Sequence, residues 1–241
     1  MYTFTNQFMA SPSNSIFLKD NMMGPNAMRL TEELAQHLNI TKDMRILDLG
    51  CGRGLSSLLL EQKYGATVFA ADLWIEPTDN YKRFKEFKVE DRIIPLLADA
   101  NKGLPFAHQY FDLLVSVDAY HYFGDSPQML PSLIHFVKKG GYIAVVLPGI
   151  KYEFGENVPA EMQPFWSAEV ARTIHSLPWW KALWEQEKGI EIVDAREMLC
   201  CQQSWDEWHT ATWEGIEEDI KMKKAENGNY YNLIQLIAKV L

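Results

Sequence analysis

The sequence predicts an α/β fold, built as a doubly wound and mostly parallel sheet with helices on both faces. Short apolar runs of strand type alternate with helical segments through residues 44–148. These runs are apolar on both sides, as are the strands of a sheet that is covered on both faces. The chain has 241 residues and is 47% hydrophobic, which is enough for one substantial core together with a lid or an insert.

The elements of the first part follow in a regular order. Residues 1–26 are polar and turn-rich, and the apolar residues from Met28 to Leu38 have helical spacing. The segments that come next are a strand at 44–49, a helix from 55, a strand at 66–73, a helix at 79–88, strands at 91–100 and 111–119, a helix at 126–140 and a strand at 141–148.

The second part is less regular. A mainly helical stretch at 158–188 precedes an expected strand at 190–199, and a closing strand is expected at 229–241. We therefore divide the chain into an N-terminal helical lid, residues 1–40, and one larger domain, residues 41–241. That domain carries helical cap elements at about 158–188 and 203–227.

The motif ILDLGCGRG, residues 46–54, ends the first expected strand. A dinucleotide fingerprint needs G-x-G-x-x-G, but Leu55 and Ser57 stand where its third glycine should be, and no Gly-Lys-Ser/Thr of a phosphate loop follows. Asp48 is poorly suited to a pyrophosphate and well suited to a cationic ligand. The glycines let a ligand approach the backbone closely.

Two further acids end the next two strands. Asp72 can accept hydrogen bonds from both hydroxyls of a ribose. Asp99 can accept one from an adenine amine, while the backbone at Ala100 contacts the ring edge. A ribose, an adenine and a cation without phosphate are the parts of S-adenosylmethionine. Taken singly, Asp72 and Asp99 are also suitable helix caps, and Gly50 and Gly54 suitable turn residues.

The motifs LDLGCGRG, AADL, ADANKGLPF, FDLLVSVDAYHYF and KKGGYIAVV occur in this order. The chain thereby resembles the class I S-adenosylmethionine-dependent methyltransferases, of the small-molecule type found in ubiquinone and menaquinone biosynthesis and in phosphoethanolamine methylation. The resemblance implies a Rossmann-like, seven-stranded sheet with an antiparallel last strand. It also implies S-adenosyl-L-methionine as methyl donor and S-adenosyl-L-homocysteine as product. The residues expected to hold the cofactor are Asp48, Gly50, Cys51, Gly52, Gly54, Asp72, Leu73, Asp99, Ala100 and Asp118, with Met23 and Gly24 from the N-terminal segment.

The acceptor site is expected after the fourth strand, which faces the transferred methyl group in this family. His121 is the first candidate for a base or an orienting donor, with a buried structural histidine as the equal alternative, and Tyr120 is the second candidate. Seven of the eight tryptophans lie between residues 166 and 213. They indicate a cap with its own core, with an aromatic substrate pocket as the second interpretation.

Composition limits the partners. The net charge of −9 disfavours nucleic acid, so a small-molecule acceptor is expected. The sequence shows no membrane insertion, no secretion signal, no disulfide framework and no metal-ligand spacing, which predicts a cytoplasmic protein without a metal. The oligomeric state is left open, with a homodimer among the options. Two other functions stay open, a non-catalytic module that binds S-adenosylmethionine or a nucleoside, and a cyclopropane-type lipid methylene transferase.

Overall fold

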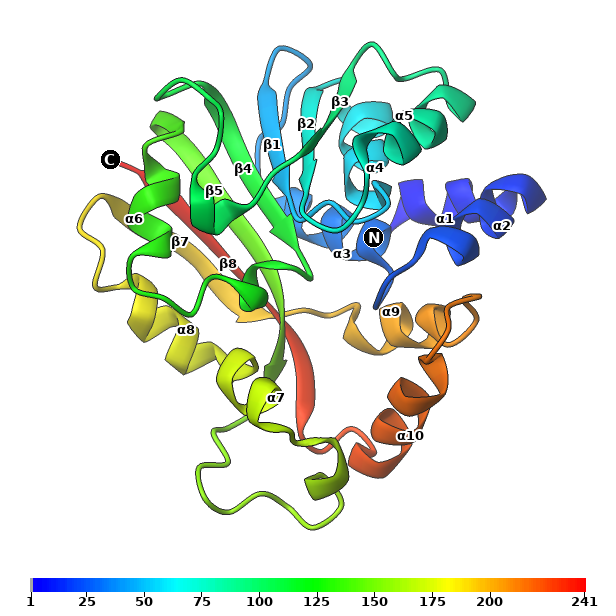
Figure 1. Cartoon of the computed structure of the whole chain (residues 1–241), viewed down its shortest axis with the longest axis vertical. Helices are drawn as coiled ribbons and strands as arrows, with labels where there is room; N and C mark the ends of the chain where they lie inside the picture. Colours follow the sequence, from blue (N-terminus) through cyan, green and yellow to red (C-terminus); the bar gives the residue numbers. More distant parts are fainter. Residues whose placement is uncertain (1) are drawn as a thin grey trace.

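The computed structural model describes residues 2–241 and has one central sheet with helices on both faces (Figure 1). Its strands are β1 (Arg45–Leu49), β2 (Thr67–Asp72), β3 (Ile93–Leu97), β4 (Phe111–Val117), β5 (Val137–Ile150), β6 (His175–Ser176), β7 (Ile190–Glu197) and β8 (Tyr231–Val240). They lie in the order β3-β2-β1-β4-β5-β8-β7, and the two-residue β6 pairs with β5.

The helices complete the two outer layers. They are α1 (Thr3–Ala10), α2 (Pro12–Asn21), α3 (Ala27–Leu34), α4 (Leu55–Tyr64), α5 (Pro77–Glu86), α6 (Met129–Ile134), α7 (Ala168–Thr173), α8 (Leu177–Trp184), α9 (Cys201–Trp208) and α10 (Ile216–Glu226). Short 3-10 turns are η1 (Ala35–His37), η2 (Ala100–Lys102), η3 (Tyr120–Tyr122) and η4 (Gln163–Phe165). No helix of residues 2–241 is long and apolar enough to cross a bilayer.

The predicted sheet is confirmed. Strands β1 to β5 pair in parallel, while β8 runs antiparallel to both β5 and β7. The seven principal strands therefore form the mostly parallel sheet with an antiparallel last strand that the resemblance implied. The short β6 is an addition that the sequence pattern did not indicate.

Two predicted segments differ from the structure. The helix expected over 126–140 is reduced to α6, and β5 already begins at Val137, so Lys138 and Lys139 belong to a strand. Residues 1–26 are not mainly turns, because α1 and α2 occupy most of them. These two helices bury few side chains of their own, so their sequences lack the regular apolar spacing that marks a helix.

The side chains of β1 show how the layers form. Successive strand residues point to opposite faces, so Ile46 joins the core under α3 and α4, while Leu47 and Leu49 join the core under α6 and α8. Asp48 shares the face of Ile46 and is completely buried. An acid at that position must therefore find its partners inside the protein.

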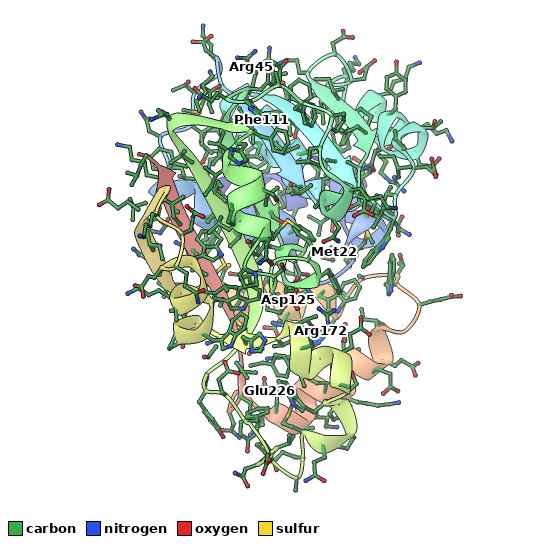
Figure 2. All side chains as sticks on the ribbon, turned by 60° about the vertical axis from the view of Figure 1, so that its left-hand side comes forward. Met22, Arg45, Phe111, Asp125, Arg172 and Glu226 are labelled. Atoms are coloured by element: carbon green, nitrogen blue, oxygen red, sulfur yellow. The ribbon has the colours of Figure 1, made fainter. Side chains whose placement is uncertain are left out.

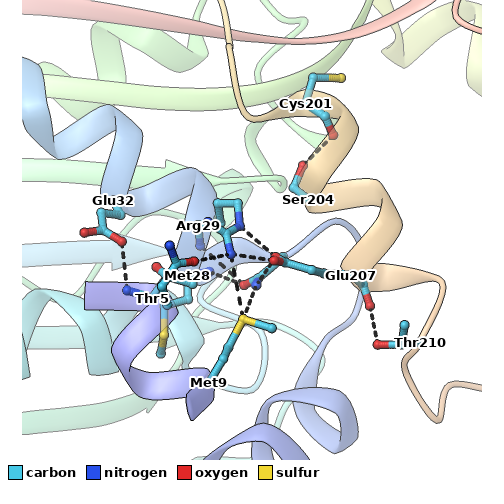
Figure 3. Close-up of polar contacts among 11 residues, drawn as sticks. Thr5, Met9, Met28, Arg29, Glu32, Cys201, Ser204, Glu207 and Thr210 are labelled. Carbon is cyan, nitrogen blue, oxygen red and sulfur yellow. Dashed lines mark hydrogen bonds and ion pairs between the residues drawn. The ribbon is translucent and has the colours of Figure 1, made fainter. Parts of the chain in front are cut away.

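A buried polar network fixes the N-terminal helices to the rest of the domain (Figure 3). Glu207 of α9 accepts hydrogen bonds from Arg29 Nε at 2.8 Å and from Asn26 Nδ2 at 2.7 Å. Glu33 accepts from the backbone N–H groups of Leu199 and Cys200. The segment that leads into the site is therefore held in place by buried charged groups. Breaking such a pair costs free energy, because it leaves one charge buried without a partner.

Gly50 lies where the chain leaves β1, and it offers a direct test of how tightly this turn is packed. Its φ is +76°, and a Cβ built on it would lie 2.3 Å from the Cβ of Ala119. We expect Gly50→Ala to lower the free energy of unfolding by more than the ~1–2 kcal/mol of a left-handed alanine, because overlap adds to the backbone strain.

Gly215 provides the matched control for that substitution. It lies in the left-handed region with a φ of +87°, but nothing lies within 4 Å of its Cβ position. Gly215→Ala should therefore show the cost of the backbone conformation alone. Urea denaturation of both variants measures the difference, and equal losses would mean that Gly50 is required only for its φ.

Candidate functional site

A cavity of about 330 Å³ lies at the carboxyl ends of the parallel strands, the edge of a doubly wound sheet where ligands bind. Its volume is in the range of small-molecule sites, ~300–1,000 Å³. Ten of the residues predicted to bind a cofactor line it, namely Met23, Gly24, Gly50, Cys51, Gly52, Asp72, Leu73, Asp99, Ala100 and Asp118. Residues far apart in the chain therefore meet in one cavity, although what each of them binds stays a prediction.

Asp72 ends β2 and faces the glycine loop. Its carboxylate accepts hydrogen bonds from the backbone N–H of Gly52 at 2.8 Å, of Trp74 at 2.8 Å and of Ile75 at 3.0 Å. A carboxylate has about four acceptor positions, so one remains free on the side of Gly52. A diol that used Asp72 for two hydrogen bonds would have to replace one of these backbone contacts.

Asp99 has a structural contact as well as a place in the cavity wall. Its carboxylate accepts from the backbone N–H of Asn101 at 3.0 Å and caps η2, and Lys102 lies 3.2 Å away. The hydrogen bond from the Asn101 backbone, followed by that from Lys102, lowers the pKa of Asp99. The capping interpretation is therefore true of Asp99, and it is compatible with a contact to a ligand.

Asp48 does not reach the cavity, in contrast to its place among the expected ligand contacts. It lies beneath the glycine loop and accepts hydrogen bonds from the hydroxyls of Ser56 and Ser57, both at 2.6 Å. Burial, with a smaller contribution from the charge of Asp72, raises the pKa of Asp48 to about 6. Its observed contacts tie β1 to the start of α4, which fixes the loop between them.

Gly54 also lies outside the cavity lining. It is the N-terminal cap of α4 with a φ of +84°, and a Cβ there would lie 2.5 Å from the ring of Phe84. Its contacts are those of a turn and close helix packing, the structural alternative that the sequence had left open.

Asp118 is the most unusual residue of the cavity wall. It has a φ of +58°, which costs a non-glycine residue about 1–2 kcal/mol. Asp118 is half-buried at the cavity wall, and among residues 2–241 no group hydrogen-bonds to its carboxylate. Burial, and then the charge of Asp219, raises its pKa to about 8. Strain and a missing partner at one residue are typical of a functional position.

Gly24 packs directly against Asp118. A Cβ on Gly24 would lie 2.3 Å from the Oδ2 atom of that carboxylate. The N-terminal segment and the end of β4 thus meet at this point, which closes one side of the cavity. The predicted contact of Met23 and Gly24 with the methionine end of a cofactor remains a prediction, but both residues lie where it requires them.

The structure does not bring Tyr120 and His121 to the cavity, so their expected position facing the acceptor needs correction. Tyr120 is fully buried against Trp184 and Phe123. His121 is 4% exposed, and burial lowers its pKa to about 3. A 3-10 turn presents successive side chains in different directions, and in η3 it is Tyr122 that turns toward the cavity.

Six charged or polar residues of the wall were missed from sequence, and they are Asn21, Arg53, Ser56, Asn101, Glu169 and Arg172. Glu169 and Arg172 belong to α7 in the cap. Arg172 forms an ion pair with Asp125 at 2.6 Å, which joins α7 to the loop after η3, and Figure 2 shows these two residues near each other. No local signal in the sequence indicates which cap helix returns to the site, because this depends on the path of the chain.

The clustered tryptophans form a core instead of a pocket. Trp180 and Trp184 are buried on one face of the sheet, and Trp205 and Trp208 on the other. Of the tryptophans in residues 2–241, only Trp74 lines the cavity. These side chains belong to the two cores of the central sheet, so the expectation of a cap with a core of its own is wrong for them.

Known protein families and individual proteins are similar to the part of the chain that lines this cavity. A family described as "Methyltransferase domain" matches residues 47–145, the segment that contains the loops after β1, β2, β3 and β4. The chain is 26% identical to methyltransferase GfsG of Streptomyces halstedii over 70% of this chain and 61% of that protein. It is 28% identical to 2-methyl-6-phytyl-1,4-hydroquinone methyltransferase of Synechocystis over 71% of this chain and 54% of that protein.

These matches leave a large part of each relative without a counterpart, since the chain spans little more than half of their length. Among solved structures, phosphoethanolamine N-methyltransferase 2 of Haemonchus contortus, in complex with S-adenosyl-L-methionine, has a TM-score of 0.72 at 15% identity. The similarity covers 99% of this chain and 59% of that one. It shows that the fold is shared.

Proposed function

Because the chain belongs to the class I S-adenosylmethionine-dependent methyltransferases, we propose that it transfers a methyl group from S-adenosyl-L-methionine to a carbon, nitrogen or oxygen atom of a small-molecule metabolite. The supporting observation is that one cavity gathers the glycine loop, Asp72, Asp99 and the unpartnered Asp118 from four successive strand ends. The acidic net charge and the size of the cavity favour a small acceptor over nucleic acid.

The residues present fit this cofactor. Gly24, Gly50 and Gly52 line the cavity without side chains, so a ligand can approach their backbone. Asp72 has one free acceptor position, and Asp118 is a carboxylate without a partner, suited to a cation. We propose that Asp72 holds the ribose, Asp99 and Ala100 the adenine, and Asp118 the methionine end. When bound, S-adenosylmethionine supplies a methyl group that is already activated by its positive sulfur.

The remaining task of the protein is to position the acceptor and exclude water. Tyr122 is 46% exposed and lies beside the cavity wall, so we assign it the position facing the acceptor that the sequence had suggested for His121. The segment 1–40 contributes Met23 and Gly24 to the wall, and we propose that it shields the reaction from solvent. Three cysteines, all free, fit a reducing compartment, and we propose that the protein acts in the cytoplasm.

Calorimetric titration with S-adenosylmethionine and S-adenosylhomocysteine tests the proposal. Both should bind in the micromolar range, and Asp72→Ala should weaken both by about tenfold, since one net hydrogen bond to a charged group contributes ~1.5 kcal/mol. Asp79→Asn, at an exposed acid of α5 paired only with Lys82, is the matched control and should leave the affinity unchanged. Absence of binding at high micromolar concentration would refute the proposal.

Turnover separates an enzyme from a non-catalytic binding module. The chain is incubated with labelled S-adenosylmethionine and a metabolite library, and methylated product is sought by mass spectrometry. Product formation that is lost in Asp72→Ala supports the enzyme. Tight cofactor binding without any product across the library would favour the binding module.

A further inference from the structure

We propose that the acceptor is a metabolite that carries an ammonium or similarly charged group, which Glu169 and the ring of Tyr122 recognise. The methyl group goes to an uncharged atom of that metabolite, or to its nitrogen after that nitrogen has lost a proton to solvent. This inference rests on the proposed function and names the substrate class of the same cavity. Besides the residues assigned to the ribose, the adenine and the methionine end, the same cavity is lined by Trp74, Tyr122, Glu169 and Arg172.

The charges around Tyr122 are negative. Besides burial, the charges of Asp118, Glu169 and Asp219 raise its pKa to about 12, so all three carboxyl groups act on this one ring. Two arginines line the cavity. Arg53 donates to the backbone carbonyl of Asp20 at 2.6 Å, and the guanidinium of Arg172 lies 2.6 Å from Asp125. Because Asp125 offsets the charge of Arg172, Glu169 adds a net negative charge beside the Tyr122 ring.

The aromatic groups point to the same class of ligand. Tyr122 and Trp74 line the cavity and are 46% and 64% exposed. Their rings meet edge to face, with centroids 5.2 Å apart, which holds the Tyr122 ring in place. An aromatic face beside a carboxylate binds cations, and quaternary ammonium ligands are the best-known case. Neither ring belongs to one of the two hydrophobic cores, and no other described tryptophan lines the cavity.

The cap supports Glu169 at this position. Ser167 caps α7 by accepting the Val170 N–H at 3.2 Å, and the Arg172–Asp125 pair anchors the same helix to the loop after η3. Glu169 lies one turn before Arg172. Arg172 is thus a positioning residue, which keeps the carboxylate over the cavity without needing to contact the acceptor.

The test uses two probes of nearly equal shape, choline and its neutral carbon isostere 3,3-dimethylbutan-1-ol. Their affinities for the full chain saturated with S-adenosylhomocysteine are measured by ligand-observed NMR. We expect choline to bind about tenfold more tightly, which is within the range of a cation–aromatic contact combined with a carboxylate. Glu169→Gln should weaken choline about fivefold and leave the isostere unchanged.

Two further variants separate charge recognition from packing. Tyr122→Phe should keep the affinity for choline, because the ring face remains, whereas Tyr122→Leu should lose most of it. Glu185→Gln is the control, since Glu185 is an exposed acid of the cap that pairs only with Lys181. Equal binding of the two probes, binding of neither, or an unchanged choline affinity in Glu169→Gln would overturn the cationic acceptor. Failure of S-adenosylhomocysteine to bind would instead overturn the proposed function.

Discussion

Replacing Glu207 by alanine is expected to lower the free energy of unfolding by about 3 kcal/mol, because it leaves the buried Arg29 guanidinium without its partner. The Arg29 side chain is 1% exposed, and its Nη1 atom already lacks a hydrogen bond within the described part of the chain. Asn26 would lose its contact with Glu207 as well. Urea denaturation measures the loss, and Figure 3 shows the network concerned.

The same substitution should reach the cavity. Asn26 caps α3 and follows the segment with Met23 and Gly24, so a loosened network should let that segment leave the wall. We expect the affinity for S-adenosylhomocysteine to fall about tenfold. Glu218→Ala is the matched control, because its pair with Lys221 is exposed and such pairs contribute ~0–1 kcal/mol. Equal stability losses in the two variants would contradict the role of the buried network.

The affinity for S-adenosylmethionine is expected to rise with pH, with Asp118 as the cause. Its pKa in the unliganded protein is about 8, so at pH 6.5 the carboxyl group is mostly protonated. A bound cation favours the carboxylate and expels this proton. Affinity should therefore increase up to tenfold per pH unit and level off near pH 8. Without ligand, the stability of the fold has the opposite pH dependence. Because the pKa of Asp118 is higher in the folded than in the unfolded chain, its contribution to the free energy of unfolding is lost as the pH rises from about 4 to 8.

Proton release is the direct measurement. Calorimetry at pH 7 in buffers of different ionisation enthalpy should show close to one proton released per cofactor bound. The titratable groups that interact with Asp118 are Asp219 and Tyr122, and the α-amino group of the ligand titrates near pH 8 in the opposite sense. Asp118→Asn should remove the release.

Asp219→Asn provides the second arm of this experiment. The substitution removes the negative charge near Asp118. An asparagine at this position can still accept the hydrogen bond from Trp208 Nε1, which is 2.9 Å long in the wild-type protein. The pKa of Asp118 should fall, so the plateau of affinity should move to lower pH. A pH profile that is identical in wild type, Asp118→Asn and Asp219→Asn would exclude Asp118 as the titrating group.

The ligand-binding edge could be anticipated because its residues end consecutive apolar strands. Asp72, Asp99 and Asp118 each stand at the end of an apolar run that predicts a strand. Parallel strands bring their carboxyl ends to one edge of the sheet. Local sequence therefore placed these residues together. The glycine spacing also excluded the pyrophosphate loop without any structure.

The predictions from sequence were wrong where the orientation of a side chain, or the groups that it contacts, determines its role. Asp48 precedes the glycines by two residues, yet the alternation of β1 turns it under α4, where two serines satisfy it. His121 and Tyr122 are neighbours, and only the turn of η3 decides which one is buried. The N-terminal helices α1 and α2 have sequences with little helical pattern, because their stability depends on tertiary contacts. Examples are the hydrogen bonds from the start of α1 to Glu32 of α3 and the packing of Phe17 in α2 against Phe87.

The amino-acid sequence by itself predicted the sheet and the edge at which the cavity lies, and it indicated the cofactor that we propose. These follow from strand periodicity and from residues within a few positions of a strand end, where local sterics and hydrogen bonding dominate. Only the tertiary structure decided what faces the acceptor. Glu169, Tyr122 and Trp74 come from three separate segments, and they meet because the core tryptophans and the Arg172–Asp125 pair pack the cap in one way.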